Sequence, residues 1–166
     1  SSFLNNNKDF KTFGMIGYKV MNTLTENGAV KRGICQEKDG YLTSLIESNV
    51  LMNNGVIEAS PLDGSPTFTV SKDTLVSMNM FLFTPYIFEI LDKDIKEFFA
   101  DKTNLDKKEF LIPDVVFNNI KKDNVKVKVL DTDGKWYGIT YKEDKDNVCQ
   151  KIKELVNTGV YPEKLW

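Results

Sequence analysis

Histidine is absent from this chain of 166 residues, and arginine occurs once, at Arg32. Without histidine there are no histidine metal sites, serine–histidine triads or cysteine–histidine dyads, so acid–base chemistry must use carboxylates, lysines or tyrosines. A net charge of −2 and a pI near 5.3 argue against nucleic acid or an anionic membrane surface as a partner. We therefore expect no nucleic-acid partner and no membrane partner.

Long hydrophobic runs are also missing, since no apolar stretch approaches the roughly 20 residues that span a bilayer. The polar N-terminus, with Asn5, Asn6 and Asn7, lacks the pattern of a signal peptide, and we expect a cytoplasmic protein. Cys35 and Cys149 have no metal-ligand spacing. We expect two reduced core cysteines, and a disulfide or a catalytic thiol remains the alternative.

Strand and helix patterns are mixed along the chain, without a repeat or a linker. Hydrophobic patterning and turn residues predict strands at 13–21, 31–36, 42–47, 74–83, 125–130 and 136–141, and helices after Thr84, at 113–122 and from Asp144. Residues 49–73 are polar, and we expect a surface segment with one or two short strands. We expect one domain over 1–166, of the α/β class, with a mixed sheet and flanking helices.

Local signals refine three of these elements. Asp39 and Gly40 predict a type I′ turn between two paired strands. Thr84 and Pro85 predict a helix with Thr as N-cap and Pro at the first position. The helical period then predicts an inward apolar face made by Ile87, Phe88, Ile90, Leu91, Ile95, Phe98 and Phe99. The last helix, capped by Asp144, is expected to point Val148, Ile152, Leu155 and Val156 inward.

No single motif fixes a chemistry from the residues alone. The chain contains no Gly-rich phosphate loop of either common type. Residues 131–134 (DTDG) resemble the start of a calcium loop, but the twelfth position is Lys142, so a plain turn is favoured. Acidic residues at 143, 144 and 146 match the charge preferred at a helix N-terminus.

Four segments taken in order are more specific. They are GAVKRGICQEKDGYLTSLIE at 28–47, SMNMFLFTP at 77–85, KKEFLIPD at 107–114, and the stretch 127–140 that ends in GKWYGIT. In order and spacing these resemble the second half of the sugar-phosphate nucleotidyltransferases, the group that includes glucose-1-phosphate thymidylyltransferase. The final stretch resembles one bacterial subgroup of that family. The resemblance covers about residues 10–166.

The resemblance implies the C-terminal part of a GT-A-like fold, with the N-terminal nucleotide-binding half absent from this chain. An intact enzyme of this kind transfers a nucleotidyl group from an NTP to a sugar phosphate and releases pyrophosphate, with Mg²⁺ as cofactor. This chain supplies the acceptor side. We expect no metal in this part alone, no activity from it, and self-association through the surface that the other half would cover.

The resemblance also implies roles for particular residues. Glu47 matches a glutamate that binds sugar hydroxyls, Gly28 a glycine that lets the sugar approach, and Lys107 a basic residue that contacts the sugar's phosphate. Asn79 stands where the family usually has glycine, and so belongs to the expected acceptor site.

The chain departs from the family at two further places. Ser48 and Asn49 replace the usual Lys-Pro after the glutamate. Gly138 occupies the position of the second metal-binding aspartate, so either Asp144 or Glu143 substitutes for it or the metal is held differently. Two rival functions stay open: a non-catalytic carbohydrate-binding or regulatory module, and a nucleotidyltransferase for another phosphorylated acceptor such as phosphocholine.

Overall fold

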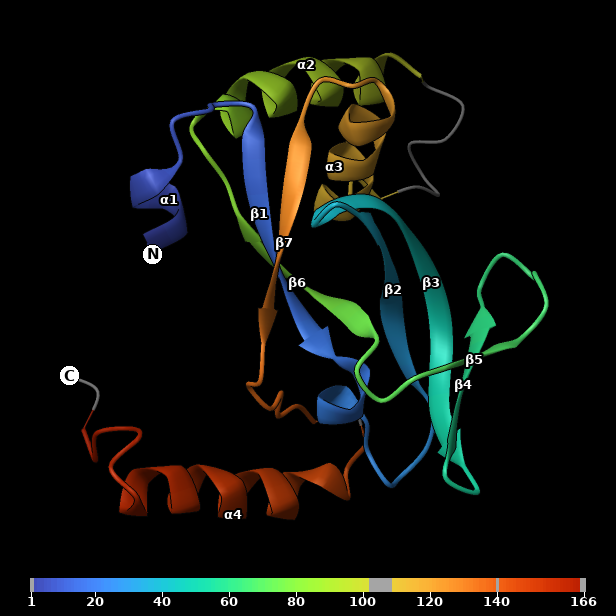
Figure 1. The fold of residues 1–166 in the computed structure, drawn as a ribbon, viewed down its shortest axis with the longest axis vertical. Coiled ribbons are helices and arrows are strands. Elements are labelled where there is room, and N and C mark those ends of the chain that lie inside the picture. The colour runs from blue at the N-terminus through green and yellow to red at the C-terminus, as the bar shows by residue number, and fades with distance from the viewer. Residues whose placement is uncertain (1, 102–108, 140, 165–166) are drawn as a thin grey trace.

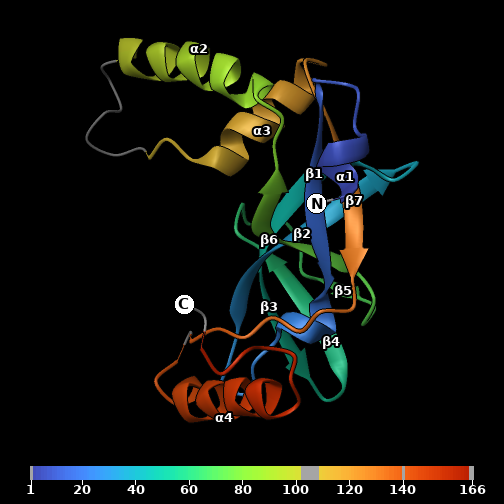
Figure 2. The same cartoon turned by 90° about the vertical axis from the view of Figure 1, so that its left-hand side faces the viewer.

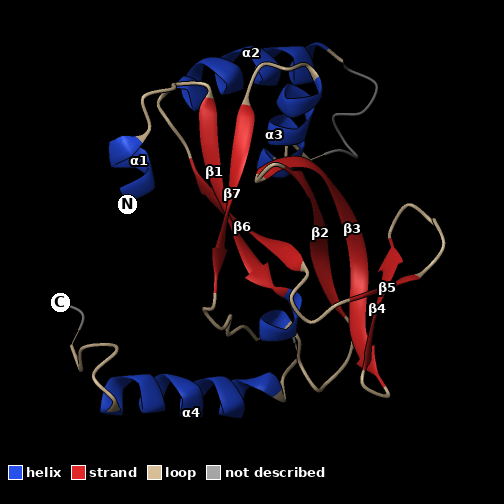
Figure 3. Cartoon of the chain, viewed as in Figure 1, coloured by secondary structure: helices blue, strands red, loops and turns tan. Residues whose placement is uncertain are grey.

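The protein is described from a computed structural model, which defines residues 2–101, 109–139 and 141–164. Its elements follow in chain order: α1 Ser2–Asn6, β1 Thr12–Lys19, the 3₁₀ turn η1 Val20–Thr23, β2 Val30–Lys38, β3 Tyr41–Asn53, β4 Val56–Pro61, β5 Phe68–Val70, β6 Leu75–Leu82, α2 Tyr86–Ala100, α3 Ile112–Lys121, β7 Lys126–Thr132 and α4 Asp144–Asn157. The expected mixed sheet with flanking helices is confirmed (Figure 3).

Five strands of the sheet close into a barrel, which the sequence did not predict. The pairs run β2–β6, β6–β1, β1–β7, β7–β3 and β3–β2, which returns to the first strand. Among the pairs of described strands, only β1 and β7 run parallel. Short strands β4 and β5 extend the sheet beyond β3. Closure leaves β1 paired on both sides, so its edge is not free to pair with another chain.

Helices α2 and α3 lie at one end of the barrel and α4 lies at the opposite end (Figures 1 and 2). At one end α2 and α3 cover a core made by β1, β7 and the hairpin end of β2 and β3, with Phe13, Met15, Val116 and Val127 almost fully buried. A second core lies between β2, β3, β4 and β6, around Val50 and Val76. At the other end α4 extends away from the barrel, and Asp144 is its only buried residue among those described.

Local signals located most of the strands. The β2–β3 turn has positive φ at both Asp39 (54°) and Gly40 (78°), as a type I′ turn requires. Lys126 and Lys128 of β7 face solvent while Val127 and Val129 are buried, as the alternation predicted. The one or two short strands expected within residues 49–73 are confirmed as β4 and β5, and residues 49–53 in addition continue β3 and pair with β4.

Three predicted details are wrong. Residues 136–139 form no strand, since the barrel is already closed and the backbone N–H of Trp136 instead donates to the Asn22 carbonyl at 3.0 Å. Thr84 does not cap α2, because its hydroxyl donates to the Phe10 carbonyl. The apolar face of α2 turns inward only in part, since Phe88 is 72% exposed and Phe99 57% exposed.

The cysteines and the predicted face of α4 also need correction. Cys149 is exposed on α4, so it is not a core residue. Cys35 is half-buried, and burial raises the pKa of its thiol to about 12, which keeps it protonated. Both thiols are free. On α4, Ile152 is 39% exposed, so the predicted inward face is only partly buried. None of the described helices is long and apolar enough to cross a membrane.

Candidate functional site

Glu47 lies in a row of residues that crosses three neighbouring strands. In β3 it stands opposite Gly33 of β2, and Gly33 stands opposite Ser77 of β6. A Cβ added to Gly33 would lie 3.0 Å from the Glu47 Oε1 atom and 3.1 Å from Leu45 Cδ1. Because Gly33 has no side chain, the Glu47 carboxylate can occupy the space above the Gly33 backbone.

The electrostatic surroundings of Glu47 come from two other segments. Partial burial of the carboxyl group raises the pKa of Glu47. The Asp114 carboxylate, at the start of α3, raises it further, while Lys31 lowers it. The side chain as a whole remains exposed. Glu47 is thus a solvent-accessible carboxylate that lacks full hydration, which favours hydrogen bonds from an incoming ligand.

Asn79 marks a distortion of β6 two residues beyond Ser77. On β1, Met15 pairs with Phe81 and Gly17 pairs with Ser77, so one residue of β1 faces three of β6. Asn79 has φ of 58° within this bulge, and its backbone N–H donates to Ser77 Oγ at 3.2 Å. Its side chain is exposed. Bulges of this kind redirect side chains, and this one leaves an exposed amide on the strand next to Gly33.

Gly28 does not join this row. It precedes β2 and lies five residues from Gly33, a separation on the order of 15 Å along an extended chain. A Cβ at Gly28 would lie 2.7 Å from the Tyr141 hydroxyl, which donates to the Ala29 carbonyl at 2.7 Å. The bare glycine therefore accommodates Tyr141 of this chain, and its φ of 146° also favours glycine.

Asp144 has a structural role at the start of α4. Its carboxylate accepts hydrogen bonds from Thr25 Oγ1 at 2.6 Å, Asn27 Nδ2 at 2.7 Å and the Tyr141 backbone N–H at 2.7 Å. These bonds tie the turn before β2 to the first turn of that helix. Glu143 is the exposed residue immediately before it.

Gly138 cannot be replaced by the family's aspartate without movement, because a Cβ there would overlap the Trp136 ring. Among the described residues, no group of three or more histidine, cysteine, aspartate or glutamate side chains lies close enough to hold a metal ion. With Asp144 occupied by three donors and position 138 covered, the donor set at 138, 143 and 144 does not fit Mg²⁺.

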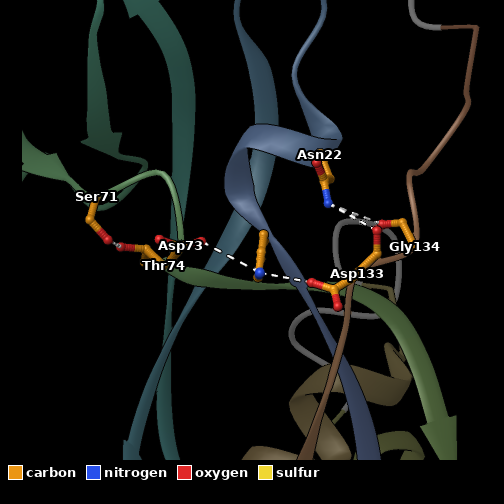
Figure 4. Close-up of polar contacts among 7 residues, drawn as sticks. Asn22, Ser71, Asp73, Thr74, Asp133 and Gly134 are labelled. Carbon is orange, nitrogen blue, oxygen red and sulfur yellow. Dashed lines mark hydrogen bonds and ion pairs between the residues drawn. The ribbon is translucent and has the colours of Figure 1, made fainter.

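The segment before Trp136 is held by a charged bridge at the end of the barrel. The Lys19 ammonium lies 2.7 Å from Asp133 Oδ1 and 3.6 Å from Asp73 Oδ1, so it links β1 to two loops (Figure 4). The hydrogen bond to Asp133 raises the pKa of Lys19 and lowers the pKa of Asp133. Asn22 Nδ2 donates to the carbonyls of Asp133 and Gly134. Asp133 therefore serves an ion pair, and the turn expected at 131–134 is wrong, because Asp131 and Thr132 are the last residues of β7.

Lys107 lies outside the described residues. A cavity of about 720 Å³ between α2 and α3 is lined next to that segment by Glu109, Phe110 and Asp114, with Asp94 and Glu97 on α2. Asp114 thus belongs both to this cavity and to the surroundings of Glu47.

The four segments singled out in the sequence meet in two groups. Glu47 lies close enough to Asp114 for their charges to interact, and Asn79 lies two residues beyond Ser77, which pairs with Gly33, so the first three segments meet near Gly33. Gly28, Gly138 and Asp144 gather beyond the other end of β2. Sequence reasoning missed Gly33, Ser77 and Asp114 as members of the site. Their signal was present, since all three lie inside the quoted segments, but only strand register shows that they meet. Neither a protein-family model nor a curated protein sequence matches the chain.

Proposed function

We propose that this chain is the acceptor side of a nucleotidyltransferase and binds a sugar phosphate through the face that carries Glu47. The supporting observation is the Glu47 carboxylate over the bare backbone of Gly33, partly desolvated and open to solvent. A carboxylate in that state accepts hydrogen bonds from two sugar hydroxyls at once. The exposed amide of Asn79 adds a donor and an acceptor on the neighbouring strand.

In the intact enzyme the sugar phosphate would attack the α-phosphorus of an NTP that the N-terminal half holds, and pyrophosphate would leave. The contribution of this chain is orientation, which can account for a large share of such a rate. Lys107 is proposed to contact the acceptor's phosphate. The relation to a GT-A-like fold is part of the same proposal, supported by the mixed sheet and by the meeting of the first three segments.

The test is a kinetic comparison in the full-length protein. We expect Glu47→Ala and Lys107→Ala each to lower kcat/KM for the sugar phosphate by roughly ten- to a hundredfold, since one charge-assisted contact contributes about 1.5–3 kcal/mol. The KM for the NTP should be unchanged. Glu37→Ala, an exposed glutamate on β2, is the matched control and should keep wild-type kinetics. Unchanged acceptor kinetics in both variants would contradict the assignment.

A second candidate is a carbohydrate-binding or regulatory module without catalysis. The closed barrel favours it, because the chain completes its own sheet pairing. Both candidates predict that this chain binds a sugar phosphate and that Glu47→Ala weakens binding. They differ in the full-length protein, where only the first predicts an encoded Gly-rich loop before residue 1 and pyrophosphate release. Preferential use of phosphocholine in that assay would identify a different acceptor.

A further inference from the structure

Arg32 is the single arginine of the chain and lies buried in β2, only 6% exposed. Its Nε–H donates to Thr23 Oγ1 at 3.0 Å, Nη1 donates to the Lys31 carbonyl at 2.8 Å, and Nη2 donates to the Thr23 carbonyl. All three acceptors are uncharged. None of the ion pairs between described residues includes Arg32.

The guanidinium therefore keeps unused donor capacity. It carries five N–H groups, and three are engaged, which leaves one on each terminal nitrogen. Burial lowers the pKa of Arg32, the direction expected when a cation loses water without gaining an anion. A buried charge of this kind is normally paired. Two N–H groups on adjacent nitrogens match the two oxygens of a carboxylate or a phosphate.

A cavity lies beside this guanidinium. It measures about 330 Å³, and its wall includes Arg32, Lys135, Trp136, Asn27 and Asn147. The Trp136 ring centroid lies 4.8 Å from Arg32 Cζ, so the indole covers one face of the guanidinium and leaves its edge for hydrogen bonding.

The acidic residues on the cavity wall do not neutralise Arg32 by direct contact. Asp144 lies on the same wall with its carboxylate engaged by Thr25, Asn27 and Tyr141. Glu26 and Glu143 also line the cavity and are exposed. The basic residues that line the cavity are Arg32 and Lys135.

We propose that this cavity is a binding site for a small ligand bearing an oxyanion, a carboxylate or a phosphate, which Arg32 holds with two parallel hydrogen bonds. The site is distinct from the one at Glu47. Arg32 and Gly33 are consecutive in β2, and successive side chains of a strand point to opposite faces. The proposal does not depend on the proposed function, because its argument rests on Arg32, Trp136 and the cavity alone.

A single arginine allows a direct test on the unmodified chain. In protein labelled with ¹⁵N-arginine, the side-chain Nε–H gives one NMR signal, which reports on Arg32 without assignment. We expect inorganic phosphate or acetate to shift it saturably, with a Kd on the order of 1 mM for two charge-assisted hydrogen bonds. Chloride at matched ionic strength should not saturate it. Saturation by phosphate alone assigns a phosphate ligand, and saturation by acetate assigns a carboxylate.

If phosphate and acetate each shift the Arg32 Nε–H signal only as chloride does, the proposal is wrong. A variant provides a second test, because Arg32→Lys keeps the charge and loses the paired N–H donors. Binding of the oxyanion should weaken at least tenfold in this variant. Trp136 fluorescence, in a Trp166→Phe background, measures the binding. Lys145→Gln removes an exposed charge outside the cavity wall and should bind as the wild type does. Equal binding by a folded Arg32→Lys protein would also contradict the assigned role of the guanidinium.

Discussion

At the residue scale, the properties of Glu47 depend on charges contributed by other elements. Partial burial raises the pKa of Glu47, Asp114 of α3 raises it further, and Lys31 of β2 lowers it. Binding that requires the carboxylate anion is complete above this pKa and is lost as the pH falls through it. Because the pKa of Glu47 is raised, the loss should begin at a higher pH than for an ordinary glutamate.

The opposite effects of Asp114 and Lys31 on the pKa of Glu47 lead to two opposite predictions. Asp114→Asn removes the like charge and lowers the pKa of Glu47, so the midpoint for loss of sugar-phosphate binding should move to lower pH. Lys31→Gln removes the attractive charge and should move that midpoint to higher pH. Calorimetric titration of this chain between pH 4 and 8 measures both. Midpoints that coincide in the two variants would show that Glu47 is not the titrating group.

At the element scale, the start of α4 is held to the barrel by one buried carboxylate. Asp144 accepts from Thr25, Asn27 and Tyr141, while the rest of α4 buries little. The attachment of this helix therefore depends on polar contacts more than on apolar burial.

Asp144→Ala should accordingly lower the free energy of unfolding by about 2–4 kcal/mol, since three charge-assisted hydrogen bonds to a buried carboxylate are lost together. Urea denaturation measures the change. Asp146→Ala is the matched control, an exposed aspartate in the same helical turn, and should stay within about 0.5 kcal/mol of wild type. A loss of the same size in both would assign the effect to helix charge instead.

At the scale of the whole molecule, the strands of the closed barrel are paired with one another, so the expected association surface is the exposed apolar side of α2. Phe88, Ile95 and Phe99 are exposed along that helix, with Leu111 and Ile112 exposed at the start of α3. Apolar side chains gathered in this way are seldom left bare on a monomer.

We therefore expect this chain to self-associate at micromolar concentration, with a closed two-fold dimer the commonest form. Sedimentation would give a mass above 19.0 kDa. Phe88→Lys together with Phe99→Lys should return the monomer, and Lys93→Gln, which changes charge alone on the same helix, should not. A wild-type monomer under these conditions would falsify the expectation.

Activity is also a property of the whole molecule. The chain has no Gly-rich phosphate loop, and the residues at 138, 143 and 144 do not fit Mg²⁺. This chain alone should therefore release no pyrophosphate from any mixture of NTP and sugar phosphate. A coupled assay measures pyrophosphate release against a buffer blank. Any release that depends on this chain would contradict the proposal that the NTP is held by the N-terminal half and the acceptor by this chain.

The sequence by itself determined the elements whose causes are local. The alternation of Val and Lys located β7, and Asp39 with Gly40 specified the turn that joins β2 to β3, because side-chain direction and φ depend on neighbouring residues. The absence of histidine and the single arginine were likewise readable from composition alone.

The tertiary structure decided which of these residues meet. Glu47 stands beside Gly33 and Ser77 through pairings that span 14 and 44 residues, and Asp114 reaches Glu47 from a helix further along the chain. Such pairings depend on the burial of the whole core, so a local pattern does not encode them. The same reason explains why residues 136–139 pair with no strand: once five strands closed the barrel, Trp136 packed over Arg32 instead.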